Sequence, residues 1–386
     1  MKTTKLNGFI AALLLVAVMM SACYRNNTAL SNESTTTSAT EITTAAPNES
    51  TAASTTETTT AALPETTTVT SAEGTDNEQP DTGAIDVSAL IPADLEIKPA
   101  LWKAVDPASG NSIYLMGTFH AVPDGTYPLP DYIEEVYANC DGIAIEYDIE
   151  KLTDPEHFDM TALQEYNAAL LYTDGTLLSD HISEETYSEI KVFADNVLGG
   201  WDEMYDNYNI GFWISTLSSL QVIGISGFDF NQGIDRYFIT KAKTDGKSVT
   251  DIEELSTQLD AINAYTDELG DYVIKDTIDN LDDYDVFAQS LVDLYTAWAT
   301  GNIDEAEALN EESLTDAEMP EDLFDDMEQY KDIMYYSRNA NMAEKAAEFI
   351  NNGDNVFFMV GMLHFAGENG IPTLLTDMGY TVEKLY

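Results

Sequence analysis

Two apolar runs that each end in the pattern Gly-x-x-His place the strongest constraint on the fold. Ser112 to Met116 (SIYLM) leads into GTFH at Gly117 to His120, and Asn355 to Val360 (NVFFMV) leads into GMLH at Gly361 to His364. Both runs are rich in β-branched and aromatic residues and predict buried strands. Two of the four histidines in the chain occupy this same position. Because α/β folds build their sites at strand ends, we predict a shared site for His120 and His364.

The remaining patterns predict an α/β (α+β) fold with a central mixed β-sheet that carries both strand ends. Leu101 to Val105 is a strand pattern, and residues 106–111 are a turn-rich link to the first run, as in a hairpin. Gly142 to Glu146 is a further buried strand that ends in a carboxylate. The segment from about 148 to 332 is mostly helical in pattern, with one strand signal at Ser248 to Ile252. We therefore predict an inserted helical lobe.

The first 22 residues are typical of a bacterial lipoprotein signal peptide. Lys2 and Lys5 precede an apolar run from Phe9 to Met20, and small residues then lead to Cys23. A transmembrane anchor is the alternative, but the apolar run is shorter than the roughly 20 residues of a span. We predict that Cys23 is the lipidated first residue, which leaves Cys140 as the single thiol and permits no intramolecular disulfide. Cys140 itself is typical of a buried structural thiol.

Residues 23–85 are predicted to form a disordered tether, and residues 86–386 the functional domain. The tether is dominated by Thr, Ser, Ala and Glu and has too few apolar side chains to offset chain entropy. A flexible spacer is the simplest interpretation, and a glycan acceptor is the alternative. The formal net charge of the chain is −53, which makes nucleic acid an unsuitable ligand. We attribute this acidity to surface solvation, since no calcium-loop motif accompanies it.

Ordered short motifs continue beyond the two histidine patterns. They include AIEYD with Glu146, Gly233-Ile234-Asp235 before a helix, Ile252-Glu253-Glu254 with Gln258, Arg338-Asn339, and the C-terminal stretch from Gly361 to Leu385. With these motifs, Leu101 to Tyr386 resembles the TraB/GumN family, which is related to the Tiki metalloproteases. The resemblance implies that both motif histidines and Glu146 come together from distant parts of the chain.

This residue set suits a divalent transition metal such as Mn, Co or Zn, with His120, Glu146 and His364 as ligands. Such an ion lowers the pKa of a bound water and supplies a nucleophile, and a carboxylate outside the ligand set can act as base. Glu253 follows a short strand as Glu146 does, so it is a further catalytic candidate. Arg338 is the candidate for binding a substrate carboxylate or an oxyanion. The alternative is that it forms an ion pair with an acidic side chain at the surface. His157 and His181 carry no motif and are interpreted as surface groups.

We therefore expect a metal-dependent hydrolase, anchored to the cell membrane on its extracytoplasmic side and acting on a secreted peptide or protein. The HExxH motif is missing, so metal use rests on the resemblance and the ligand types. One alternative is a surface lipoprotein that captures a peptide without turnover. Another is an esterase, because the erythromycin esterases look like distant relatives of this family and use His and Glu residues in a similar way. No surface feature of the sequence argues for an oligomer.

Overall fold

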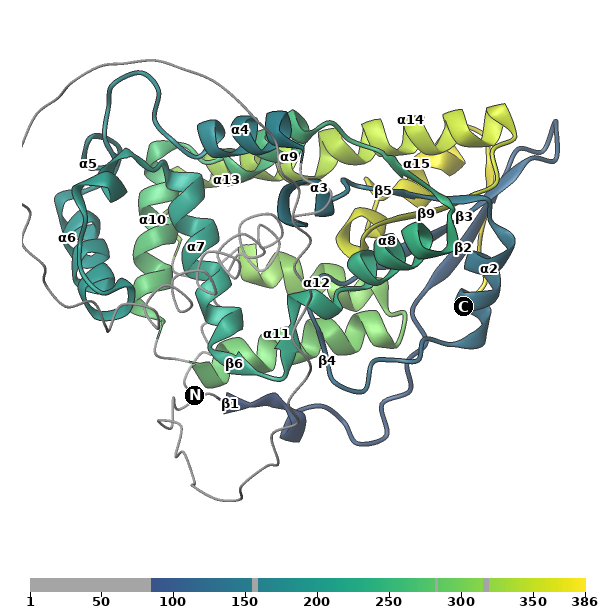
Figure 1. Ribbon diagram of the computed structural model, residues 1–386, viewed down its shortest axis with the longest axis horizontal. Helices are drawn as coiled ribbons and strands as arrows, with labels where there is room; N and C mark the ends of the chain where they lie inside the picture. Colours follow the sequence, from purple (N-terminus) through teal and green to yellow (C-terminus); the bar gives the residue numbers. More distant parts are fainter. Residues whose placement is uncertain (1–84, 155–158, 282–283, 315–318) are drawn as a thin grey trace, which may run out of the picture. The chain divides into compact units, whose positions relative to one another are not determined.

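The structure is a computed structural model that describes residues 85–154, 159–281, 284–314 and 319–386 (Figure 1). The predicted signal peptide, Cys23, His157 and almost all of the tether lie outside these residues. Within the described ranges, no helix has both the length and the apolar composition that crossing a membrane requires.

A six-stranded mixed sheet forms the centre of the domain, in the order β10-β2-β3-β9-β5-β8. The fold class predicted from the sequence is confirmed. The β2–β3 hairpin has the predicted turn, since Val105 pairs with Ser112 across it. The six strands are β2 (Leu101–Val105), β3 (Ser112–Thr118), β5 (Gly142–Ile145), β8 (Ser248–Asp251), β9 (Val356–Gly361) and β10 (Thr381–Lys384).

Four of these strands, β3, β9, β5 and β8, run parallel to one another. The register pairs Thr118 with Gly361, and Ile145 with both Met359 and Asp251. Every residue of β5 and β9 is buried, as expected for parallel strands that are covered on both faces. The carboxyl ends of the four strands therefore meet at one edge of the sheet.

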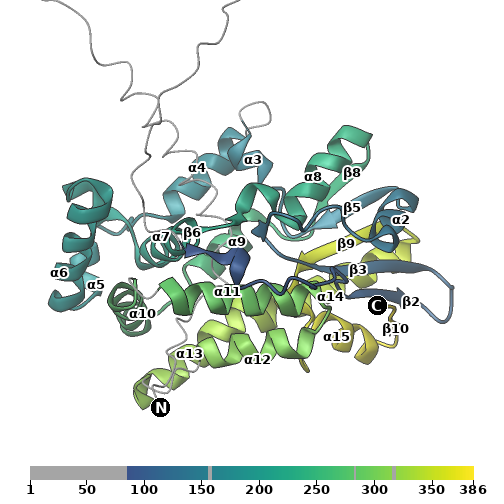
Figure 2. The ribbon, with the colours of Figure 1, turned by 90° about the horizontal axis from the view of Figure 1, so that it is seen from below.

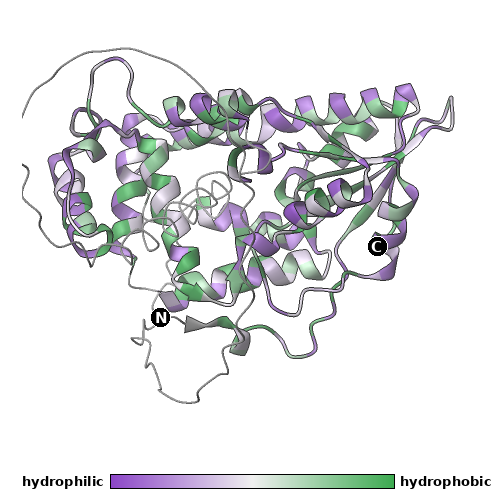
Figure 3. Ribbon diagram, in the orientation of Figure 1, coloured by the Kyte–Doolittle hydropathy of each residue, from purple (hydrophilic) through white to green (hydrophobic). Residues whose placement is uncertain are grey.

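Helices cover both faces of the sheet. Figures 1 and 2 show α2 and α8 on one face, and α14 and α15 on the other. In Figure 3 the strands are mainly green and the helices alternate between green and purple, as amphipathic helices do. Gly353 ends α14 in the left-handed region (φ 76°), which glycine adopts without strain. The four helices are α2 (Asp131–Asn139), α8 (Ile234–Asp245), α14 (Ser337–Asn352) and α15 (Ile371–Asp377).

The segment from about 148 to 332 is mostly helical, as predicted, but it is not a separate lobe throughout. It includes β8, which pairs with β5 in the central sheet, and α8, which packs against both strands. The other helices of the segment are α3 (Glu150–Thr153), α4 (Met160–Ala169), α5 (Leu178–His181), α6 (Glu184–Phe193), α7 (Ile210–Ile223), α9 (Leu255–Ile262), α10 (Asp267–Asp279), α11 (Tyr284–Ala299), α12 (Ile303–Leu314) and α13 (Phe324–Lys331).

Two hydrophobic cores hold these parts together. One lies between the sheet and its flanking helices and includes Phe357 and Phe358, both fully buried. The other lies among α6, α7, α10 and α13, around Trp213 and Tyr330. Each buried aromatic or aliphatic side chain stabilises the fold by about 1.5–3 kcal/mol. The two cores explain why the helical part keeps a defined position beside the strand ends.

Short elements complete the fold. The two-residue strands β1 (Ile85–Asp86) and β6 (Ile225–Ser226) pair in parallel, and β4 (Val122–Pro123) and β7 (Phe228–Asp229) pair antiparallel. The 3-10 and π turns are η1 (Val87–Ala89), η2 (Ala194–Leu198), η3 (Glu203–Asn207), η4 (Phe230–Gln232), η5 (Glu321–Leu323), η6 (Asp332–Tyr336) and η7 (Met362–Phe365).

Candidate functional site

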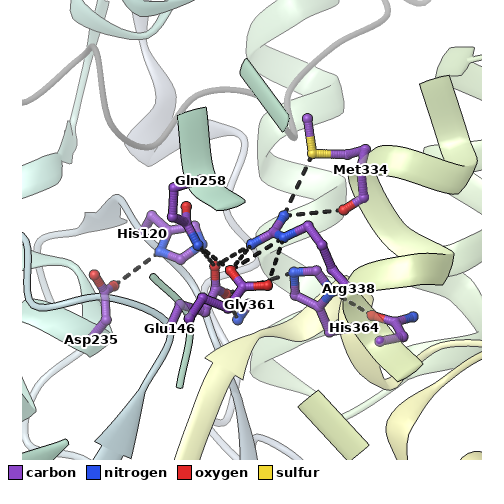
Figure 4. Close-up of polar contacts among 10 residues, drawn as sticks. His120, Glu146, Asp235, Gln258, Met334, Arg338, Gly361 and His364 are labelled. Carbon is purple, nitrogen blue, oxygen red and sulfur yellow. Dashed lines mark hydrogen bonds and ion pairs between the residues drawn. The ribbon is translucent and has the colours of Figure 1, made fainter. Parts of the chain in front are cut away.

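Each of the four parallel strands delivers one polar side chain at its carboxyl end. His120 follows β3 by two residues, Glu146 directly follows β5, and Glu253 follows β8 by two residues. His364 lies in η7, the single turn after β9. Figure 4 shows the rings of His120 and His364 on either side of Glu146 and Gly361. The predicted meeting of the two histidines with Glu146 is therefore what the structure shows.

The Glu146 carboxylate is held by hydrogen bonds to both of its oxygens. The Gly361 N–H donates to Oε1 at 2.5 Å, while Arg338 Nη2 and Gln258 Nε2 donate to Oε2 at 3.1 and 3.3 Å. Oε1 also lies 3.8 Å from His364 Nε2. Burial opposes ionisation, but the imidazole of His364, the guanidinium of Arg338 and the other neighbours lower the pKa of Glu146 to about 2. This carboxylate is ionised at any physiological pH.

The Arg338 guanidinium uses all of its N–H groups within the protein. Nε and Nη2 donate to Glu253 at 2.8–3.2 Å, and Nη2 also donates to Glu146. Nη1 donates to the Met334 carbonyl at 3.1 Å and lies 3.7 Å from its sulfur (Figure 4). No N–H remains for a substrate carboxylate or an oxyanion, the roles expected from the sequence. The geometry instead assigns Arg338 to holding the two carboxylates in place.

Glu253 lies behind Arg338 and lines neither of the two cavities at the site. Its side chain is 3% exposed and accepts hydrogen bonds from Arg338 and Gln258. Burial raises the pKa of Glu253 despite the contact with Arg338. We therefore assign Glu253 a positioning role, one contact away from the reacting groups.

Asp235 orients the His120 ring. Its Oδ1 lies 3.1 Å from His120 Nδ1, and it sits in the first turn of α8, where the helix dipole favours an anion. The Gly233-Ile234-Asp235 motif explains this placement. The Ile234 N–H donates to the Phe119 carbonyl at 2.9 Å, and a Cβ on Gly233 would lie 2.4 Å from the His120 carbonyl oxygen. Only glycine allows α8 to begin this close to the end of β3.

Asn339 orients the His364 ring in a comparable way. Its Oδ1 lies 2.5 Å from His364 Nδ1, and its Nδ2 donates to the Asn369 carbonyl at 2.9 Å. That second hydrogen bond fixes the amide, so its oxygen must face the ring and Nδ1 must carry the proton. An aspartate oxygen fixes the same tautomer in His120. Both histidines therefore direct the lone pair of Nε2 away from these partners.

The glycines of the two motifs are required for close approach rather than for an unusual turn. Gly361 has φ −49° and ψ 140°, which any residue can adopt. A Cβ on Gly361 would lie 3.1 Å from Glu146 Oε1 and 3.2 Å from His120 Nε2. A Cβ on Gly117 would lie 2.7 Å from the Met362 Cα. Gly361 keeps the centre of the site open, while Gly117 lets β3 pack against the start of η7.

Two cavities adjoin this centre. The larger, of about 100 Å³, has walls that are mostly apolar side chains of the surrounding helices. The smaller is also mostly apolar, and its lining includes Tyr147, Asp235 and Arg236. Both are lined by Thr118, His120, Glu146, Phe230 and Gln258. A substrate chain that crosses the centre would place one group in each cavity.

His364 is built to stay neutral. Burial, together with the positive charge of Arg338, lowers its pKa to about 3. In the metal-free protein, the unfolded chain therefore binds a proton between pH 6.5 and 3 that the folded chain does not bind. We expect the free energy of unfolding to fall on acidification through this range, by up to about 1.4 kcal/mol per pH unit.

Urea unfolding at pH 7, 6, 5 and 4 measures this loss of stability. His364→Asn is the control, because its amide can donate to Asn339 but cannot titrate. The difference in unfolding free energy between the wild type and His364→Asn should shrink as the pH falls. If the unfolding free energies of both proteins fell by the same amount, His364 would be excluded as the source of the pH dependence.

The donor set of the site suits a divalent metal ion. Among the described residues, no three His, Cys, Asp or Glu side chains form a ready-made metal cluster. His120 and His364 nevertheless each have Nδ1 held by an oxygen, which is the usual outer contact of a metal-binding imidazole. Glu146 and Glu253 also place two carboxyl groups beside the one guanidinium of Arg338. The residues that would hold the ion are His120, His364 and Glu146.

Four residues at the site were not among the predicted site residues: Thr118, Asp235, Gln258 and Asn339. All four lie inside the motifs that carry the family resemblance, which is the one signal that could have identified them. Of the other residues discussed from the sequence, His181 is partly buried, stacks on Tyr172 and lies 3.0 Å from Asp267. Cys140 is a buried free thiol, and burial raises its pKa to about 11. The thiol therefore stays protonated at neutral pH, as expected for a buried structural cysteine.

Comparison with protein families finds one match. The family model described as TraB/PrgY/gumN matches residues 100–384, a range that contains every residue of the site. The comparison with curated proteins and the comparison with solved structures both found no match. The family resemblance drawn from the motifs is thereby confirmed.

Proposed function

Because the chain belongs to the TraB/PrgY/gumN family, we propose that this site hydrolyses a peptide or protein with the help of a divalent metal ion. The observation that carries the proposal is the convergence of His120, Glu146 and His364 at one sheet edge, with both imidazoles in the tautomer that a metal requires. Four parallel strand ends at one edge are also where open α/β sheets bind ligands.

The ion would be held by Nε2 of both histidines and by Glu146. When bound, it would supply a Lewis acid for the substrate carbonyl and an activated water. The excess of carboxyl groups over guanidinium favours binding a cation at this place. Mn, Co and Zn all accept such a ligand set.

The surrounding residues maintain the geometry of the ligands. Asp235 holds the His120 ring and Asn339 holds the His364 ring. Arg338 and Gln258 hold the Glu146 carboxylate. The three ligands therefore need no reorganisation during the reaction. The apolar cavity is lined by Leu291 and Leu294 of α11 and by Met334 and Leu363. It suits an apolar side chain next to the cleaved bond, and it excludes water from that side of the reaction.

The proposed location follows from the first 23 residues. A basic start, an apolar run and Cys23 support a lipid anchor on the extracytoplasmic side of the cell membrane, with residues 24–85 as a spacer. A secreted peptide or protein would be the accessible substrate.

A metal-independent, esterase-like hydrolase is the second candidate. One observation favours it: a carboxylate, Asp235, holds His120, whereas an amide holds His364. An Asp–His pair is the usual arrangement of a general base in hydrolases. Capture of an apolar peptide without turnover is the third candidate, which the apolar cavity could also serve.

The test is metal content by mass spectrometry, together with peptide cleavage with and without chelator. The protein is purified without chelators and loaded with Mn, Co or Zn, beside His120→Ala and His364→Ala. His181→Ala is the matched control, because this histidine lies outside the site. We expect stoichiometric metal and peptide fragments in the wild type and in the control only. Cleavage without any metal would favour the esterase-like candidate, and protection of an uncleaved peptide would favour capture.

A further inference from the structure

The Thr118 side chain is a buried polar group without a hydrogen-bond partner in the part of the chain that the structure describes. Thr118 is the second residue of the first motif and lies at the end of β3, paired in register with Gly361. It is 2% exposed, and its Oγ1 makes no hydrogen bond to any described residue. A buried hydroxyl without a partner is unfavourable, because it has lost its hydrogen bonds to water. Such a group at a site indicates a ligand that completes its hydrogen bonding.

Thr118 also lies beside the centre of the site. Thr118 is one of the five residues that line both cavities, together with His120 and Glu146. A substrate that spans the two cavities would therefore pass over Thr118 at the point where its reacting bond meets the histidines.

The other side-chain donors that line the apolar cavity are already in use. Every N–H group of Arg338 has a partner, and Gln258 Nε2 donates to both Glu146 and Glu253. The Nε2 atoms of both histidines carry lone pairs rather than protons in the tautomers set by Asp235 and Asn339. The Tyr335 hydroxyl, which also lines this cavity, donates to Asn310 Oδ1 at 3.4 Å. Among the described residues of the lining, Thr118 therefore has the uncommitted hydroxyl.

We infer that the Thr118 hydroxyl donates a hydrogen bond to the carbonyl oxygen of the cleaved bond as that oxygen gains negative charge. This role rests on the proposed hydrolase function. In the step, water adds to the carbonyl carbon, and the π electrons of the carbonyl move to its oxygen. The carbonyl then re-forms, the bond from carbon to nitrogen breaks, and the proton released by the water ends on the leaving nitrogen. The hydrogen bond from Thr118 stabilises the intermediate more than the substrate, so it acts mainly on kcat.

Two substitutions separate this role from a packing role. Thr118→Val has nearly the same shape and lacks the hydroxyl, whereas Thr118→Ser keeps the hydroxyl and loses a methyl group. Since Oγ1 has no partner among the described residues, Thr118→Val should unfold at the same temperature as the wild type or at a higher one. Thr118→Ser should unfold at a lower temperature, because it leaves a small gap in the packing.

Turnover is measured with full-length, metal-loaded protein. The probe is a pool of fluorescence-quenched peptides with leucine or phenylalanine beside the central bond, chosen to fit the apolar cavity. We expect Thr118→Val to lose about 10²-fold in kcat with KM within about twofold. Thr118→Ser should remain within about fivefold of the wild type. The more stable variant would then be the less active one, which a packing role cannot produce.

Three results would overturn the inference. Full turnover in Thr118→Val would remove the role of the hydroxyl while leaving the proposed hydrolase intact. Equal losses of kcat in both variants, in step with lower unfolding temperatures, would assign Thr118 to packing. No cleavage of any peptide by the wild type would reject the proposed function itself, and with it this role of Thr118.

Discussion

Replacing Arg338 with methionine is expected to lower the free energy of unfolding by about 3–5 kcal/mol. The guanidinium is 7% exposed and lies against Glu146 and Glu253, which are 12% and 3% exposed. Methionine would fill a similar volume but would leave two buried carboxyl groups without a cation. The loss is therefore the cost of the unpaired acids, and it would be measured by urea unfolding at pH 7.

Arg236→Met is the matched control for this experiment. Arg236 is the other arginine of the described domain, and it makes hydrogen bonds to Asn231 and Thr153 at a partly exposed position. Its replacement should cost less than about 1 kcal/mol. Adding Glu253→Gln to Arg338→Met should recover part of the lost stability, because it removes one of the orphaned charges. If Arg338→Met were no worse than Arg236→Met, the buried network would not hold the site together.

Replacing Gly361 with alanine is expected to reduce the proposed hydrolysis by about 10-fold to 10²-fold. The added methyl would lie 3.1 Å from Glu146 Oε1 and 3.2 Å from His120 Nε2. Both contacts are tighter than ordinary packing, so these two groups would have to shift by a few tenths of an ångström. A misplacement of about 1 Å costs on the order of 10²-fold in rate, which sets the upper end of the expected loss. Initial rates with the peptide pool, together with metal content, would measure the loss.

Gly117→Ala distinguishes the role of Gly117 in packing from the role of Gly361 at the centre of the site. Its methyl would meet the backbone of Met362 at 2.7 Å, so β3 and η7 would have to move apart. We expect Gly117→Ala to lower the free energy of unfolding by about 1–3 kcal/mol, as overpacking does. Gly361→Ala should cost clearly less, since it faces side chains beside a cavity. An active Gly361→Ala protein would show that the reacting groups do not converge over this glycine.

Much of the fold could be predicted from the sequence, because the signals are local. The strand patterns at 112–116 and 355–360 and the turn-rich link at 106–111 each predicted the element that the structure contains. The mostly helical segment was also predicted, but not how its one strand pairs. Ser248 to Ile252 was identified as a strand, but no local signal shows that it pairs with β5 in the central sheet. Strand pairing depends on contacts between distant segments, and periodicity does not encode them.

The candidate site divides in the same way. Gly-x-x-His and a strand-end glutamate are local patterns, so His120, Glu146 and His364 could be identified before the structure was known. The role expected for Arg338 differed from what the structure shows, because the sequence does not reveal that Glu146 and Glu253 use its N–H groups. Three further residues could be assigned to the site only from the structure. Asp235 and Asn339 were recognised by their hydrogen bonds to the histidines, and Thr118 by its unpaired hydroxyl.

The positions of the strands, their ends and the chemically active side chains at those ends can be identified from the chain alone. These properties follow from the apolar pattern of a few consecutive residues. Which of these groups hydrogen-bond to one another, and which remain available, depends on how distant segments pack together. The partners lie far apart in the chain: the residue numbers of His120 and Asp235 differ by 115, those of Glu146 and Arg338 by 192, and those of Glu146 and Gly361 by 215. A hydrogen bond needs its two atoms within about 3 Å, and only the packing of sheet and helices brings groups so distant in sequence to that separation.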